Sequence, residues 1–151
     1  MGHIHKILVP MDGSPSSIAA LTQALTLAED VGAGVDVLHV GASGAGERDM
    51  ESAIAEAKKW LGDRLVRHDE DGDPVRKILE TASAEKADLI VMGTHGRVGR
   101  LHALLGSVAE SVVRNAPCPV LTVRQPDGEE ESFSERIHHR EPIGKQAPPS
   151  R

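Results

Sequence analysis

The chain has 151 residues, of which 26% are charged and 39% hydrophobic, and a formal net charge of -6. This length suits one domain with a sizeable core, and the negative charge opposes binding to nucleic acid or to an anionic membrane surface. Trp60 and Phe133 are the only aromatic residues, so a base-stacking platform for single strands is excluded. No apolar run approaches the length of a membrane span, and no signal-peptide core precedes the first apolar run, so we expect a soluble cytoplasmic protein without membrane insertion.

The first third of the chain predicts a strand, a turn, a helix and a second strand. The apolar run Lys6 to Met11 ends at Asp12-Gly13-Ser14, and Pro15 suits the first position of a helix after a serine cap. Apolar residues at helical spacing continue to Gly32. Gly34 to Val40 then predicts a second strand that is mostly apolar, as buried parallel strands are.

The alternation continues to residue 123. Helical spacing predicts a helix over about Asp49 to Leu61 and another that starts at Asp73-Pro74. The predicted strands are Leu65 to His68, a short edge strand closed by a polar run, then the buried strand Leu89 to Met92 and the final strand Pro119 to Val123. Five strands alternating with four helices predict an α/β fold, a doubly wound and mostly parallel sheet with helices on both faces.

The connection from Gly93 to Ser107 is too long for an ordinary strand-to-helix loop and contains four glycines, Arg97, Arg100, two histidines and no carboxylate. Glycine backbone, positive charge and a following helix N-terminus indicate an anion site. Ser107 and Glu110 also fit a capping box, S-x-x-E, which would need no ligand. The capping box explains Ser107 but neither the loop's length nor its arginines, so we favour the anion site.

Asp12, like Ser107, can be given either a structural role or a ligand-binding role. It can form an Asx turn, or its carboxylate can accept from the hydroxyls of a ribose or hold a metal. Considered alone, the turn is the better reading. Opposite a cationic phosphate loop, the acceptor role gains weight.

These motifs together resemble a known family. Gly93-x2-Gly96-x9-Gly106-Ser107 resembles the G-2x-G-9x-G-[S/T] nucleotide signature of the universal stress protein family. The segments ILVPMDGS at residues 7–14 and GSVAESVVRNAPCPVLTVR at residues 106–124 resemble the family's first strand and C-terminal stretch. The resemblance covers about residues 3–124, and the complete set of glycines is typical of the family's ATP-binding branch.

The resemblance implies a strand order of 3-2-1-4-5 and a bound adenine nucleotide. In the family, positions matching Pro10, Met11 and Asp12 line the adenosine, and the backbone at Val40 meets the adenine. Gly93 lies against the ribose, and the phosphates are held by Gly96, Gly106, Ser107 and the backbone of Val108. We add Met92 as a further candidate, and His95, Arg97, Arg100 and His102 from the charge of the loop. Mg²⁺ or Mn²⁺ would be held mainly by phosphate oxygens and water, because no carboxylate cluster is present.

We therefore predict a regulatory module that binds ATP with little or no catalysis. A slow ATPase or phosphotransferase is the first alternative; the chain lacks a G-x4-G-K-[S/T] loop, and His95 would serve as a base only if suitably oriented. A nucleotide-free dimerisation scaffold is the second. The family pairs its fifth strand across a two-fold axis, so we expect a homodimer through Pro119 to Val123.

The remaining features of the sequence give less information about function. Residues 1–124 are expected to form the nucleotide-binding domain, and the charged, proline-rich residues 125–151 a disordered tail. The pairs His3/His5 and His138/His139 lack fixed partner ligands, so a metal site is not expected at either. Cys118, between two prolines, is expected to be a packing residue.

Overall fold

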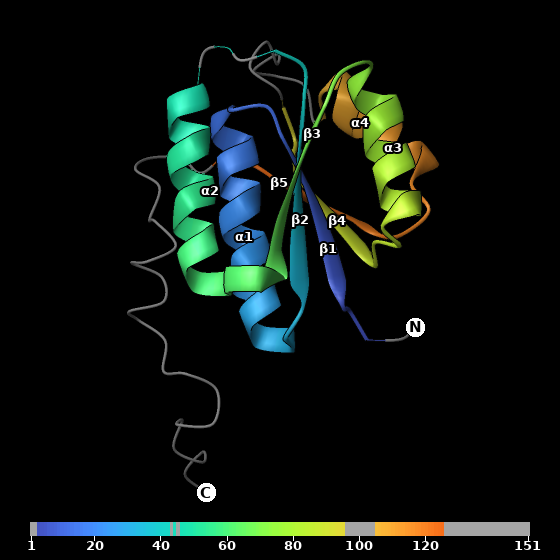
Figure 1. Ribbon diagram of the computed structural model, residues 1–151. Coiled ribbons are helices and arrows are strands. Elements are labelled where there is room, and N and C mark those ends of the chain that lie inside the picture. Colours follow the sequence, from blue (N-terminus) through green and yellow to red (C-terminus); the bar gives the residue numbers. More distant parts are fainter. Residues whose placement is uncertain (1–2, 43, 45, 96–104, 126–151) are drawn as a thin grey trace, which may run out of the picture.

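The computed structural model describes residues 3–42, 44, 46–95 and 105–125. Strands and helices alternate along this part of the chain (Figure 1). The elements are β1 Lys6–Met11, α1 Pro15–Val31, β2 Gly34–Val40, α2 Glu47–Leu61, a 3-10 turn Gly62–Arg64, β3 Leu65–Glu70, α3 Pro74–Ala84, β4 Leu89–Gly93, α4 Ser107–Asn115 and β5 Val120–Val123.

The sheet has the order β3-β2-β1-β4-β5, and each neighbouring pair is parallel. This confirms the predicted doubly wound α/β fold and the order implied by the family resemblance. Helices α1 and α2 cover one face, and α3 and α4 cover the other (Figure 1). The order reverses between β1 and β4, because the chain leaves β1 for a helix on one face and β4 for a helix on the other.

Each face of the sheet has its own aliphatic core. Alternate residues of the central strands point to opposite faces, so Ile7 and Val9 pack under α1 and α2 while Leu8 packs under α3 and α4. Leu8, Val9 and their neighbours on β2 and β4 are fully buried. Strands covered on both faces are continuous apolar runs, which is why the sequence predicted them.

Two helices begin where the sequence predicted a cap followed by proline. The Ser14 hydroxyl accepts a hydrogen bond from the Ser17 amide, and the Asp73 carboxylate accepts one from the Arg76 amide at 2.9 Å. In both cases proline occupies the first helical position, where a missing N–H costs nothing. Helix α1 ends at Gly32, whose φ of 74° is the left-handed cap conformation that favours glycine.

The third strand is longer than predicted. The sequence indicated an end at His68, but pairing with β2 continues to Val40 opposite Glu70. An edge strand can carry polar side chains without losing its backbone pairing. In β3, a polar side chain also connects the strand to helix α2. Arg67 makes two hydrogen bonds of 2.6 Å to Glu51 of α2, and hydrogen bonding by Arg67 lowers the pKa of Glu51.

The fold brings the carboxyl ends of β1 and β4 side by side at the reversal point. In open parallel sheets, ligands bind outside the carboxyl ends of the strands at this position. Among the helices of the described residues, none has the length and apolar character that crossing a membrane would need. The predicted tail lies outside the described residues from residue 126 on.

Candidate functional site

A cavity of about 710 Å³ lies at the carboxyl edge of the sheet, where the strand order reverses. Its walls come from the ends of β1, β2 and β4 and from the first turns of α3 and α4. This volume is within the usual range of small-molecule and cofactor sites. The position agrees with the crevice expected for a doubly wound sheet.

The structure gathers the predicted site residues around this one cavity. Every predicted residue within the described part of the chain lines it: Pro10, Met11, Asp12, Val40, Met92, Gly93, His95, Gly106, Ser107 and Val108. The others, Gly96, Arg97, Arg100 and His102, lie outside the described residues. Residues separated by about a hundred positions in the sequence therefore share one site, and their contact with a ligand stays a prediction.

The start of α4 differs from the capping-box alternative. Ser107 is the first helical residue and Gly106 is the N-cap, in extended conformation and with no side-chain hydrogen bond to the helix. The hydroxyl of Ser107 is thus one position too late to act as the cap. The first turn of α4, from Ser107 to Glu110, lines the cavity without a side-chain cap, so it presents the positive end of a helix dipole there.

The long loop is closed at its base by hydrogen bonds. The amide of Gly106 donates to the carbonyl of Thr94 at 2.6 Å, and the amide of Thr94 donates to Val123 of β5 at 3.0 Å. The hydroxyl of Ser16 donates to the carbonyl of His95, and His95 Nδ1 lies 3.0 Å from Thr94 Oγ1. Both ends of the segment that carries the arginines are therefore fixed to the scaffold.

Asp12 performs the structural role that the sequence allowed. Its Oδ1 accepts a hydrogen bond of 2.9 Å from the amide of Ser14, which is an Asx turn. Asp12 is nevertheless exposed and lines the cavity, and the second carboxylate oxygen offers further acceptor capacity. The two readings of Asp12 do not exclude each other.

One wall of the cavity is apolar and was missed by the sequence analysis. Leu38 of β2 and Ile78 and Pro74 of α3 lie beside Val40 and Met92. Leu38 and Ile78 are core residues, 0% and 3% exposed, so the apolar surface that a ligand could reach comes mainly from Val40 and Pro74. A flat apolar ligand group would contact aliphatic side chains here.

Gly93 lies where β4 passes very close to α1. A Cβ built on Gly93 would meet the side chain of Ser16 and would lie only 2.7 Å from the Ser16 carbonyl carbon and 2.8 Å from the Ser17 nitrogen. Ordinary contacts of this kind begin near 3.4 Å. The absence of a side chain at Gly93 is therefore required by helix-to-sheet packing, whatever its backbone contacts in the cavity.

The ionisable groups among the described cavity residues are Asp12, His95 and Glu110. Glu110 forms an ion pair of 2.7 Å with Arg114 one turn along α4. Positive charge for an anion would come from the helix N-terminus and from Arg97 and Arg100, and both arginines are outside the described residues.

Cys118 is not part of the cavity. It is half-buried against the core beneath α3 and α4, and burial raises the pKa of its thiol. A raised pKa lowers the thiolate fraction, and the thiolate is the reactive form. This agrees with the predicted packing role.

Comparison with known proteins gives a consistent family assignment. Residues 3–124 match the universal stress protein family. Universal stress protein MJ0531 of Methanocaldococcus jannaschii is 38% identical, with 82% of this chain and 84% of the relative covered. A Thermus aquaticus protein, "Universal stress protein in QAH/OAS sulfhydrylase 3'region", is 39% identical, with 78% of this chain and 97% of the relative covered.

A solved structure shows the same architecture. The structure described as a universal stress protein in complex with cAMP superimposes with a TM-score of 0.68 at 28% identity, covering 83% of this chain and 100% of that chain. Fold, sequence match and signature residues agree, and the chain belongs to the universal stress protein family.

Proposed function

We propose that this protein binds ATP in the cavity at the carboxyl edge of the sheet and acts as a nucleotide-dependent regulatory module. The observation that carries the proposal is the start of α4, a helix N-terminus without a side-chain cap that lines a cavity of about 710 Å³. The first amides of a helix have no hydrogen-bond partner within the helix, and together with the positive dipole end they suit phosphate. A structurally similar universal stress protein is described as bound to cAMP, which supports an adenine nucleotide as the ligand.

Each part of the nucleotide has a matching part of the cavity. The apolar wall with Val40 and Pro74 suits the faces of the adenine. Asp12, through the oxygen not used in its turn, suits a ribose hydroxyl. The amides of Ser107 and Val108 suit phosphate oxygens, whereas the amide of Gly106 is already bonded to Thr94.

A divalent ion such as Mg²⁺ or Mn²⁺ fits this arrangement only as a companion of the phosphates. Near the start of α4 the described cavity residues include one carboxylate, that of Glu110, and it is paired with Arg114. Mg²⁺ commonly keeps several waters and binds through phosphates with one or two carboxylates. The ion would lower the charge repulsion of the triphosphate.

The assembly we propose is a homodimer through β5. Strand β5 is an edge of the sheet in the described part of the chain, and Leu121 on it is 39% exposed. Exposed apolar edge strands tend to be covered by another strand or element. A cytoplasmic location is proposed with it, on the basis of the sequence composition.

The proposal is tested by removing one amide without disturbing the helix. Ser107 occupies the first helical position, where proline is tolerated, and Gly106 before it has φ -72° and ψ 166°, which a following proline allows. Ser107→Pro removes the amide donor and the hydroxyl, and Ser107→Ala removes only the hydroxyl. A hydrogen bond to a charged group contributes about 1.5–3 kcal/mol, so we expect Ser107→Pro to weaken ATP binding about tenfold or more beyond Ser107→Ala.

The measurement is calorimetry with ATP, ADP, AMP and cAMP, together with thermal unfolding of each variant. ATP should raise the unfolding temperature of the unmodified chain by mass action. Unchanged unfolding temperature in excess ATP would favour the nucleotide-free scaffold. Equal ATP affinity in both Ser107 variants would contradict a phosphate at the start of α4.

A further inference from the structure

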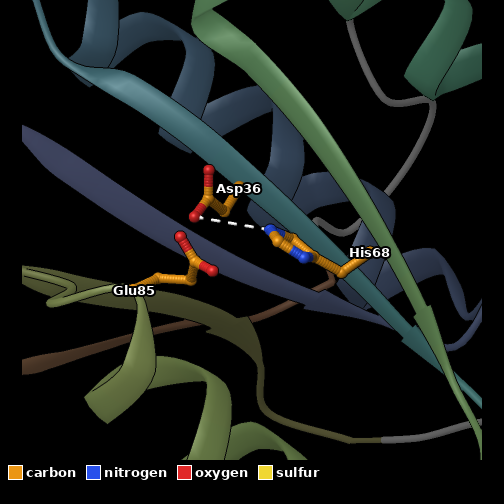
Figure 2. A group of neighbouring side chains, drawn as sticks. All are labelled: Asp36, His68 and Glu85. Atoms are coloured by element: carbon orange, nitrogen blue, oxygen red, sulfur yellow. Dashed lines mark ion pairs between the residues drawn. The ribbon is translucent and has the colours of Figure 1, made fainter.

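A second polar cluster lies on the face of the sheet covered by α3 and α4, outside the nucleotide cavity. Asp36 of β2, His68 of β3 and Glu85 at the C-terminal end of α3 point toward one another (Figure 2). One ligand atom from each, a carboxylate oxygen from each acid and an imidazole nitrogen, lies within 4.8 Å of the other two. None of the three residues lines the nucleotide cavity.

Asp36 is the unusual member, because it is a carboxylate only 2% exposed within an apolar strand. Its Oδ2 and His68 Nε2 are buried atoms without a hydrogen-bond partner among the described residues. The two atoms are 3.6 Å apart, which is too long for a hydrogen bond. A buried carboxylate oxygen without a hydrogen bond is costly, so a strongly bound cation at this point would offset the cost.

A positive charge already lies beside these acids. The ammonium of Lys6 is 3.7 Å from Asp36 Oδ2 and 3.3 Å from Glu85 Oε2. The Lys6 side chain is 35% exposed, so it can turn toward solvent when another cation arrives. Glu85 caps the C-terminal end of α3, where the helix dipole also favours a cation.

The ligand atoms of Asp36, His68 and Glu85 indicate which cation would bind. One imidazole nitrogen and two carboxylate oxygens are ligands for Zn²⁺, which binds them at about 2.0–2.2 Å with tetrahedral geometry and can take water as its fourth ligand. Atoms around such an ion are about 3.3 Å apart. The Asp36 to His68 separation of 3.6 Å is close to this, and Glu85, with 37% of its side chain exposed, is free to approach.

We propose that Asp36, His68 and Glu85 form a Zn²⁺ site that exchanges with the Lys6 ammonium. The site joins β2 and β3 to the end of α3, so bound Zn²⁺ would stabilise the edge strand. It is independent of the proposed nucleotide binding, because its ligands are not cavity residues.

The test uses the full chain with four histidines outside the proposed site replaced. His3, His5, His138 and His139 are replaced by alanine, which leaves a background protein without H-x-H and H-H sequences that bind metals adventitiously. Zn²⁺ is then titrated by competition with a chromophoric chelator, and Co²⁺ absorption reports the coordination geometry. We expect one equivalent of Zn²⁺, a tetrahedral Co²⁺ spectrum and a rise in unfolding temperature with Zn²⁺.

Variants then assign the ligands. His68→Ala and Glu85→Gln should each weaken Zn²⁺ binding at least about tenfold, because mutations outside the ligands already cost that much in metal sites. Lys6→Met should strengthen it about two- to fivefold, since the competing ion pairs are partly exposed. Lys6→Met does not remove a proposed ligand, so weaker Zn²⁺ binding by this variant would contradict the exchange of Zn²⁺ with the Lys6 ammonium.

His39→Ala is the matched control. His39 is also on β2 and lies 3.6 Å from one carboxylate, that of Asp69, but on the opposite face of the sheet. It should leave Zn²⁺ binding unchanged. No stoichiometric binding, or equal loss in His39→Ala and His68→Ala, would overturn the proposal; unfolding without Zn²⁺ checks that each variant is folded.

Discussion

Gly93→Ala is expected to destabilise the fold in the absence of any nucleotide. The added methyl group would meet two backbone atoms of α1, at 2.7 Å on Ser16 and 2.8 Å on Ser17. These atoms would have to retreat by about 0.6–0.7 Å to reach ordinary contact at 3.4 Å. Backbone atoms cannot rotate away as a side chain can, so α1 would have to shift as a whole.

The expected change in the free energy of unfolding of Gly93→Ala is the difference between two opposing effects. Overpacking a well-packed region costs about 1–3 kcal/mol, and a contact with backbone belongs at the upper end of that range. Replacing glycine by alanine returns about 0.4–1 kcal/mol by restricting the unfolded chain. We therefore expect a net loss of about 2 kcal/mol in the free energy of unfolding.

Urea unfolding followed by circular dichroism measures this loss, with Trp60 fluorescence as a second probe. Gly44→Ala is the matched control, because a Cβ at Gly44 meets nothing within 4 Å. Adding Ser16→Ala to Gly93→Ala should recover little, since the backbone contacts remain. A Gly93→Ala protein within about 0.5 kcal/mol of the unmodified chain, but without ATP affinity, would refute the packing explanation and assign this glycine to the ligand.

Three further outcomes are expected. Gly106→Ala should keep the free energy of unfolding within about 0.5 kcal/mol, since its φ of -72° suits alanine, and should weaken ATP binding about tenfold in calorimetry; a loss of stability instead would contradict this. The amides of His5 and Lys6 lower the pKa of Asp88 below its usual 3.8, so its contribution to stability is present above about pH 4 and is lost as pH falls through the folded value. Asp88→Asn should flatten the acid side of a urea-midpoint profile, and an unchanged slope would argue against it. Leu121→Arg should convert the proposed dimer to monomer in light scattering, and a persisting dimer would place the interface elsewhere.

Much of the fold could be predicted because its signals are local. Buried parallel strands are apolar throughout, and the caps at Ser14-Pro15 and Asp73-Pro74 are short-range patterns. The end of β3 could not be predicted, because its last residues are polar and only backbone pairing with β2 keeps them in the strand. The cavity residues could be named from the family signature, but the wall supplied by α3 depends on how two distant elements pack.

The cluster of Asp36, His68 and Glu85 could not be predicted from the sequence. A single acid in an otherwise apolar strand could have been noticed, as could a histidine in an edge strand. Their meeting with Glu85 and Lys6 depends on the register of β1, β2 and β3 and on the length of α3. Each member therefore has an ordinary individual explanation, and only the three-dimensional arrangement gives a reason to consider them together.

The glycines of the nucleotide signature also separate into different physical roles. Gly93 has no room for a side chain because α1 is in the way, so its requirement exists in the empty protein. Gly106 has a conformation that any residue can adopt, and no described hydrogen bond depends on its missing side chain, since its amide would still reach Thr94. Packing thus explains the first glycine without a nucleotide, whereas the backbone conformation of the second does not require glycine. The close approach of α1 therefore accounts for Gly93 in the empty protein, and this glycine does not by itself indicate a ligand.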